Sequence, residues 1–407
     1  MKQLDIDFVR AQFPAFSEPS MEGRAFFENA GGSFPCRFVT DRLERFYRER
    51  KVQPYETYEP SHSGGQEMDE AQTRLSAMLG VDTDELSFGP STTQNVYVLA
   101  QAFREMLTPG DAIIVTNQDH EANTGAWRRL SNAGIEVREW QIDPETGHLD
   151  PHDLEPLLDG AKLLCFPHCS NVIGEINDVA AISAMAHDAG AVTCVDGVSY
   201  APHGLPDVDA LGADIYMFSA YKTYGPHQGL MVIRRALAEA LPNQGHAFNA
   251  GSLTKRFTPA GPDHAQVAAS AGMADYVDAL YAEMGLPDAA PNARACIVHD
   301  AMRNREIALL EPLLDYLTAR NDIRVLGPRQ AAPRAPTVAI AHKQPGSKLS
   351  AALAPHGIMA GGGDFYAVRP LHSMGIDPDH GVLRVSLTHY TSEAEASQLV
   401  KSLDQVL

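Results

Sequence analysis

The chain of 407 residues has little of what marks secreted, membrane or nucleic-acid-binding proteins. Its five cysteines lack the spacing of a disulfide framework, which favours a reducing compartment. Lys and Arg number 32 against 52 Asp and Glu, and the net charge of −20 disfavours nucleic acid or an anionic membrane as a partner. No apolar run approaches the roughly 20 residues that cross a bilayer, and residues 1–7 are polar and acidic, unlike a signal peptide. We expect a soluble, cytoplasmic protein.

Two of the cysteines, Cys165 and Cys169, flank His168, and such a cluster suggests a metal site. The run 163–167 is apolar, however, which is more typical of a buried strand. We therefore expect no metal.

The distribution of apolar residues predicts an α/β fold. Between about residue 70 and residue 240, apolar runs such as 112–115, 163–166 and 230–233 alternate with amphipathic stretches such as 179–186. This alternation predicts a mostly parallel sheet with helices on both faces.

The chain exceeds the length of one ordinary domain, so we expect two. Residues 264–283 and 297–321 have the pattern of long helices, and the proline-rich stretch 328–336 predicts a loop. Residues 337–341 and 382–386 are typical of strands in a smaller α+β unit. We predict an N-terminal segment (1–20) packing on the small domain, a large domain (21–280) and a small C-terminal domain (281–407).

Lys222 has the least ordinary surroundings of any residue in the chain. It follows the apolar run 215–218 within a small, hydroxyl-rich turn, between Tyr221 and Tyr224. A desolvated lysine loses its proton easily and becomes the nucleophilic amine that a Schiff base with an aldehyde requires. Taken alone, however, a lysine at the end of a strand is more often structural or solvated.

Asp196 ends a second apolar run, 191–195, one loop-and-strand excursion before Lys222. A carboxylate at the carboxyl end of a strand often points into the ligand crevice of an open α/β sheet. An aspartate facing a pyridinium nitrogen and a lysine facing an aldehyde are the pair that pyridoxal phosphate needs. A helix cap is the alternative interpretation of Asp196.

Further motifs accompany these two residues. Thr92 and Thr93 stand where a strand is expected to turn into a helix, which is an anion site, although a simple helix cap has the same pattern. The other motifs are residues 27–32, 119–123, 170–174, 196–203, 219–222 and 381–390. Together with Thr92 and Thr93, and in this order over about residues 20–400, these motifs resemble those of the class V, fold-type I pyridoxal-phosphate enzymes, in the branch of cysteine desulfurases and selenocysteine lyases.

The resemblance implies a fold, a cofactor and an assembly. It implies a large domain with a mostly parallel seven-stranded sheet flanked by helices, and a smaller α+β C-terminal domain. It also implies pyridoxal 5′-phosphate bound to Lys222 as a Schiff base, a small amino-acid substrate, and a homodimer with the site at the subunit interface.

The resemblance also assigns roles to single residues. Lys222 and His120 are catalytic by resemblance; His120 stacks on the cofactor ring and shuttles a proton, which its ordinary near-neutral pKa allows. Arg384 grips the substrate carboxylate with charge-assisted hydrogen bonds, near Ala30 and Gly31 at the substrate mouth. Without the resemblance, a lone histidine is more often structural. The cofactor contacts it implies are Thr92, Thr93, His120, Asn171, Asp196, Ser199, Ser219, Tyr221 and Lys222, and Asn171 is also a substrate contact or, without the resemblance, a turn residue.

Several positions depart from the family pattern. Ser199 stands where many desulfurases have glutamine, and Tyr221 where histidine is usual. The segment expected to reach the neighbouring subunit's phosphate, 259–264, lacks the usual threonine. Desulfurases also carry a nucleophilic cysteine on a C-terminal loop, here 361–371, but no cysteine follows position 296.

The loop without its cysteine still carries polar and aromatic residues. We expect the glycines at 361–363 to form a mobile hinge beside the site. Asp364, Tyr366 and Arg369 are expected to face the substrate side chain.

These observations favour a pyridoxal-phosphate enzyme that cleaves a carbon–sulfur or carbon–selenium bond by β-elimination, without the usual loop cysteine. A class V aminotransferase or epimerase is the alternative within the same chemistry. A catalytically silent pyridoxal-phosphate binder with a regulatory role is the alternative outside it.

Overall fold

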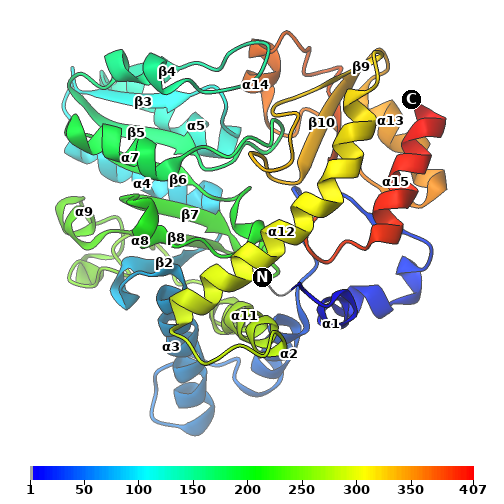
Figure 1. The fold of residues 1–407 in the computed structure, drawn as a ribbon. Helices are drawn as coiled ribbons and strands as arrows, with labels where there is room; N and C mark the ends of the chain where they lie inside the picture. Colours follow the sequence, from blue (N-terminus) through cyan, green and yellow to red (C-terminus); the bar gives the residue numbers. More distant parts are fainter. Residues whose placement is uncertain (1–2) are drawn as a thin grey trace.

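The computed structural model describes residues 3–407 and is built around a seven-stranded sheet (Figure 1). The strand order is β2-β8-β7-β6-β5-β3-β4, and only β8 runs against its neighbours, because it is antiparallel to both β2 and β7. The mostly parallel seven-stranded sheet is thereby confirmed. The strands are β2 (Leu86–Gly89), β3 (Ala112–Thr116), β4 (Glu136–Trp140), β5 (Ala161–Pro167), β6 (Val192–Asp196), β7 (Ile215–Ser219) and β8 (Gly229–Ile233).

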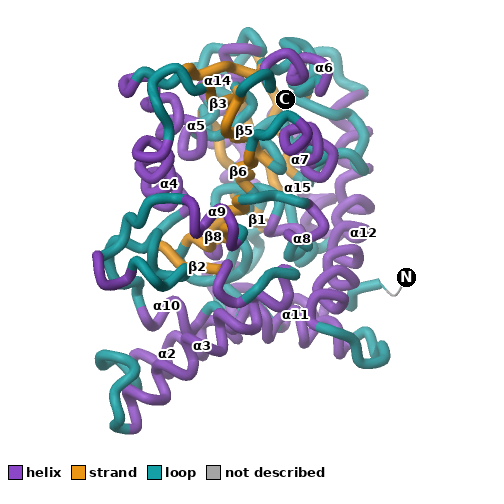
Figure 2. The backbone as a smooth tube through the Cα atoms, turned by 90° about the vertical axis from the view of Figure 1, so that its left-hand side faces the viewer, coloured by secondary structure: helices purple, strands orange, loops and turns teal. Residues whose placement is uncertain are grey.

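Helices cover both faces of this sheet, and alternate strand residues therefore enter two different cores. Ile113 and Met217 pack with α4 and α5 on one face, whereas Ile114 and Phe218 join the core under α7 on the other. Figure 2 shows α4 and α5 on one side of the strands and α7 and α8 on the other. The helices are α4 (Thr92–Met106), α5 (Glu121–Arg128), α6 (Pro151–Leu154), α7 (Val179–Asp188), α8 (Val208–Leu211) and α9 (Arg235–Ala240).

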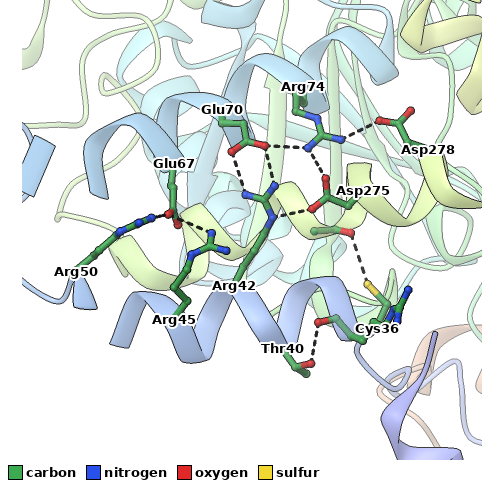
Figure 3. Close-up of polar contacts among 12 residues, drawn as sticks. Cys36, Thr40, Arg42, Arg45, Arg50, Glu67, Glu70, Arg74, Asp275 and Asp278 are labelled. Carbon is green, nitrogen blue, oxygen red and sulfur yellow. Dashed lines mark hydrogen bonds and ion pairs between the residues drawn. The ribbon is translucent and has the colours of Figure 1, made fainter. Parts of the chain in front are cut away.

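A second layer of helices lies beside the sheet and is joined by ion pairs (Figure 3). Arg42 on α2 reaches Glu70 on α3 at 2.8 Å and Asp275 on α11 at 2.7 Å. Arg74 on α3 contacts the same Asp275 and also Asp278, at 2.8 Å. The helices are α2 (Arg37–Glu49), α3 (Glu59–Leu79), α10 (His264–Ala269) and α11 (Ala271–Glu283).

The helix predicted over 264–283 is in fact two helices that meet at Ser270. The Ser270 hydroxyl donates to the side-chain oxygen of Gln228 at 2.9 Å. This bond attaches the junction to the segment between Lys222 and β8.

The C-terminal part is an α+β unit with the antiparallel sheet β12-β13-β10-β9. Helix α12 starts six residues before the expected residue 297, and the predicted loop 328–336 contains no helix or strand. The elements are α12 (Pro291–Thr318), β9 (Ile323–Val325), β10 (Thr337–His342), α13 (Gly346–Leu353), β11 (Ile358–Met359), β12 (Gly361–Gly363), α14 (Val368–Ser373), β13 (Val382–Ser386) and α15 (Glu393–Val406).

The prediction of a mobile glycine hinge at 361–363 is wrong. These glycines form β12, which is hydrogen-bonded along β13 with Gly361 opposite Arg384. A Cβ at Gly362 would overlap the carbonyl group of Gly346. Gly362 therefore allows the close approach of α13.

The N-terminal segment contacts both parts of the chain. Arg10 on α1 (Ile6–Ala11) donates to Glu395 at 2.8 Å and to the carbonyl oxygen of Tyr390 at 2.9 Å. Phe13 packs edge-on against Tyr276 of α11, with ring centroids 5.3 Å apart. Strand β1 (Ala25–Phe26) pairs with β11 in the C-terminal part. The predicted domain limits, residues 20 and 280, stay a prediction.

None of the described helices is both long and apolar enough to span a membrane.

Candidate active site

The predicted site residues meet at one edge of the large sheet, where β2, β3, β5, β6 and β7 have their carboxyl ends. Ligands bind at this edge in open α/β sheets. The site has two connected parts, an inner cavity and a wider mouth. The inner cavity is lined by Thr92, Thr93, His120, Asn171, Asp196, Ser199, Ser219, Tyr221 and Lys222. The mouth, of about 500 Å³, is lined by Ala30, Gly31, Asn171, Lys222 and Arg384, among others.

Lys222 ends a 3-10 turn that follows β7, and its side chain is buried. Burial, and secondly the positive charge of Arg384, lower the pKa of the Lys222 amine to about 8. The turn is fixed by its neighbours: the Ser33 hydroxyl donates to the Lys222 carbonyl oxygen at 2.8 Å, and Tyr224 is held at a φ of 62°. An appreciable fraction of neutral amine is therefore present near physiological pH.

Two buried carboxylates lie near this amine. Burial raises the pKa of Asp196 to about 6, although the backbone N–H of Val198 donates to its carboxylate at 2.8 Å. Burial and the charge of Asp196 raise the pKa of Asp119 well above its ordinary value. A cationic group bound beside Asp196 would offset this burial and keep its carboxylate ionised.

The start of α4 forms an anion site. The hydroxyls of Thr92 and Ser219 lie 2.8 Å apart, and Thr93 lines the same cavity. A Cβ at Gly229 would lie 2.6 Å from the Thr92 backbone nitrogen, so the absence of a side chain lets β8 approach the start of the helix. Backbone N–H groups, the helix dipole and hydroxyls together suit a phosphate.

His120 caps α5, and its Nδ1 accepts the backbone N–H of Ala122 at 3.0 Å. Burial, followed by the charges of Lys222 and Arg384, lowers the pKa of His120 to about 3. At this pKa the His120 ring is neutral at physiological pH, and its role as a proton shuttle stays a prediction. The neutral ring carries its hydrogen on Nε2, because Nδ1 is an acceptor. Its stacking on a cofactor ring stays a prediction.

Arg384 on β13 is buried at the mouth of the site. Its guanidinium lies 3.8 Å from the centroid of the Phe365 ring, and its Nη1 donates to the Asn171 carbonyl oxygen at 3.1 Å. Its Nη2 is paired with Glu28. Within residues 3–407, Arg384 Nε and Asn171 Oδ1 are buried without a hydrogen-bond partner, so the site offers one more donor and one more acceptor to a ligand.

The loop that lacks the family cysteine lies across the mouth. Phe365 and Tyr366 have φ values of 53° and 57°, which are strained for residues with side chains. Tyr366 lines the mouth as predicted and lies 5.5 Å, between ring centroids, from His120. Arg369 is turned instead to Glu121, at 3.2 Å, and Asp364 accepts the backbone N–H of Tyr366.

No activated thiol replaces the missing one. All five cysteines lie in the described part of the chain, and Cys169 alone lines the inner cavity. Burial raises the pKa of Cys169 to about 12, and its sulfur lies 3.5 Å from the carbonyl oxygens of Ser170 and Gly174. A thiol in this state is a poor nucleophile.

Three residues of the site were not predicted from the sequence: Asp119, Glu28 and Phe365. Asp119 follows β3 and precedes His120, so its place after a buried strand was a usable signal. Glu28 and Phe365 gave no such signal, because each acts through Arg384, which is far from Glu28 in the sequence.

The chemistry of the groups that line the inner cavity suits pyridoxal phosphate. The cavity presents an amine for an aldehyde, a carboxylate for a ring nitrogen, an anion site for a phosphate, and an unpartnered amide oxygen on Asn171. These are the groups that an enzyme working through a Schiff base requires.

Comparison with known proteins identifies the family. The chain belongs to the class V aminotransferases, whose sequence model matches residues 25–399. It is a class V pyridoxal-phosphate enzyme of the cysteine desulfurase type, as predicted.

Relatives match over nearly the whole chain. An aminotransferase-like protein, FGM3 from Gibberella zeae, is 34% identical over 99% of this chain and 98% of its own length. A cysteine desulfurase of Serratia proteamaculans is 29% identical over 98% of both chains. The fold matches a cysteine desulfurase of Thermococcus onnurineus, with a TM-score of 0.85 at 22% identity, covering 100% of this chain and 98% of the other.

Proposed function

We propose that this protein binds pyridoxal 5′-phosphate as a Schiff base on Lys222 and eliminates a sulfur or selenium leaving group from an amino acid. The observation that carries the proposal is the buried Lys222 amine, whose pKa of about 8 suits a nucleophile, in one cavity with Asp196. When bound, the cofactor supplies an electron sink for charge developed on the substrate α-carbon.

The residues of the site have separate tasks in this proposal. Thr92, Thr93 and Ser219 bind the phosphate together with the start of α4. Asp196 would stabilise the positive charge of the cofactor's ring nitrogen. Lys222 would also move protons at the substrate α-carbon, because an amine with a pKa of about 8 can both accept and return a proton.

The substrate is held at the mouth by Arg384, whose guanidinium pairs with its carboxylate. His120 is neutral, so it would add no charge to the face of the cofactor ring that it is expected to cover.

Elimination explains the absence of a reactive cysteine better than persulfide transfer does. The loop 361–371 contains no thiol, and Cys169 is held protonated by burial. Release of sulfide or selenide by β-elimination needs no protein thiol to receive the leaving group.

We also propose that the enzyme is a cytoplasmic homodimer. A surface cavity of about 420 Å³ is lined by Tyr55 and Phe248, which are 57% and 85% exposed. Exposed aromatic residues around a hollow favour a protein partner. Segment 259–264 borders this cavity and a neighbouring one that contains Thr93, so a second copy seated here would lie close to the proposed phosphate site.

The test is to incubate the holoprotein with L-cysteine or selenocysteine under a reductant and to quantify sulfide or selenide together with the amino-acid-derived product. Lys222→Ala is the blank, and Lys348→Ala, an exposed lysine on α13, is the matched control. Release that depends on Lys222 but not on Lys348 supports the proposal. A yellow, borohydride-reducible protein that releases neither product would contradict it.

Aminotransfer is the second candidate, because a relative of 34% identity is described as aminotransferase-like. Formation of a keto acid in step with a transferred amino group would favour it. A protein that is yellow and does neither reaction would be a silent cofactor binder.

A further inference from the structure

Glu28 occupies an unexpected place in the site. It follows β1, and its carboxylate is paired with Nη2 of Arg384, the residue proposed to bind the substrate carboxylate. An acidic side chain thus already lies where an acidic group of the substrate is expected.

The structure makes room for this pairing at two positions. A Cβ at Gly31 would lie 2.8 Å from Glu28 Oε1, and a Cβ at Gly361 would lie 2.6 Å from Glu28 Oε2. Glycine at these two positions therefore lets the carboxylate lie against the guanidinium.

The pairing is incompletely satisfied. Within the described chain, Glu28 Oε2 and Arg384 Nε are buried without a hydrogen-bond partner. A buried ion pair with unfilled hydrogen bonds recovers less of its desolvation cost than a complete one, so it is the kind of contact that a better partner can replace.

The side chain of Glu28 can move away from Arg384 into the mouth. Its backbone is fixed by a bridge to Ser386 and by N–H groups of Gly31 and Gly32 that donate to its carbonyl oxygen. Its side chain, in contrast, is 28% exposed and lines the mouth of about 500 Å³. Rotation of the side chain alone would free Arg384.

We propose that Glu28 is a specificity-determining residue that holds Arg384 until the carboxylate of the substrate displaces it. This inference rests on the proposed function in taking Arg384 as the carboxylate site. The substrate carboxylate then binds in competition with Glu28. The displaced Glu28 carboxylate stays in the mouth without its guanidinium partner, and its charge disfavours acidic substrate side chains.

The test is a binding titration of the holoprotein with propanoate, a carboxylate without an amine, followed by ligand-observed NMR. Glu28→Gln keeps an oxygen that can accept from Arg384 but removes the competing charge. We expect it to bind propanoate about tenfold more tightly than the unchanged protein, because the repulsion of two neighbouring carboxylates is lost.

Glu121→Gln is the matched control. Glu121 lines the same mouth and carries the same charge, but it pairs with Arg369 instead of Arg384. Its substitution should change propanoate binding less than twofold.

Two outcomes would overturn the inference. Weaker or unchanged propanoate binding in Glu28→Gln, with binding still lost in Arg384→Ala, would show that Glu28 only positions Arg384. Propanoate binding that persists in Arg384→Ala would show that Arg384 is not the carboxylate site, and the inference would then fail. Neither result depends on a Schiff base at Lys222. Borohydride reduction tests that Schiff base separately.

Discussion

At the scale of single residues, the reactivity of Lys222 follows from its burial, which makes the charged ammonium form unfavourable. Its side chain is 8% exposed and lies near another cation, Arg384, while Asp196 gives only partial compensation. The charged form is disfavoured, so the pKa of the amine falls to about 8. The sequence showed an apolar strand before this lysine, which made the burial predictable; the effect of Arg384 needed the structure.

The pKa of Lys222 predicts how Schiff-base formation depends on pH. Only the neutral amine attacks an aldehyde, so the rate at which the apoprotein combines with pyridoxal phosphate should rise between pH 7 and pH 9, with a midpoint near 8. Stopped-flow absorbance measures this rate. In Arg384→Ala the midpoint should move to higher pH, because a charge that disfavours the ammonium form is gone. A midpoint near that of free lysine in both proteins would contradict the prediction.

At the scale of elements, the sequence predicted the strands of the large sheet well and β12 poorly. Strands such as β3 and β7 are buried on both faces and therefore read as continuous apolar runs. Strand β12 consists of three glycines, which weaken strands in general, so its pattern indicated a hinge. The structure explains two of these glycines: a Cβ at Gly362 would overlap Gly346 at the start of α13, and one at Gly361 would crowd Glu28.

Gly362→Ala should therefore destabilise the C-terminal sheet. Its Cβ would overlap the backbone of Gly346, and relieving this contact requires a shift of α13 or of β12. We expect a loss of about 2 kcal/mol or more in the free energy of unfolding, measured by urea denaturation. Gly251→Ala, where a Cβ would meet nothing within 4 Å, is the control and should cost little. Equal stabilities of the two variants would refute the packing argument.

The ion pairs that join α2, α3 and α11 are a second case at this scale (Figure 3). Asp275 accepts from both Arg42 and Arg74, and its side chain is only 22% exposed. Asp275→Asn should lower the free energy of unfolding by about 1–3 kcal/mol, since two partly buried guanidinium groups lose a shared carboxylate.

Glu44→Gln is the matched control for this network. Glu44 pairs with Arg48 on the surface of α2, and both side chains are more than half exposed. Exposed pairs of this kind contribute at most about 0.5 kcal/mol. Thermal and chemical unfolding of the two variants should therefore differ clearly, and a loss for Asp275→Asn no larger than that for Glu44→Gln would show that the network carries no stability.

At the scale of the whole molecule, the site depends on segments from both ends of the chain. Glu28 and Arg384 are 356 positions apart in sequence, yet they form one contact at the mouth. Motif order made the meeting of Lys222, Asp196 and Arg384 predictable: Asp196 ends β6, Lys222 follows β7, and Arg384 lies within β13. The pairing of Arg384 with Glu28 was not predictable, because it is decided by how far one side chain reaches across a folded cavity.

The exposed aromatic residues around the surface cavity predict that two copies of the whole molecule form a dimer. Phe248→Glu should convert the proposed dimer into a monomer, because a carboxylate buried against a second copy would lose its hydration without gaining a partner. Sedimentation velocity at several concentrations measures the change. Met106→Glu is the control: Met106 is also exposed, at 37%, but does not line that cavity, so the variant should remain a dimer. A monomeric unchanged protein, or a Phe248→Glu variant that sediments as a dimer, would place the interface elsewhere or remove it.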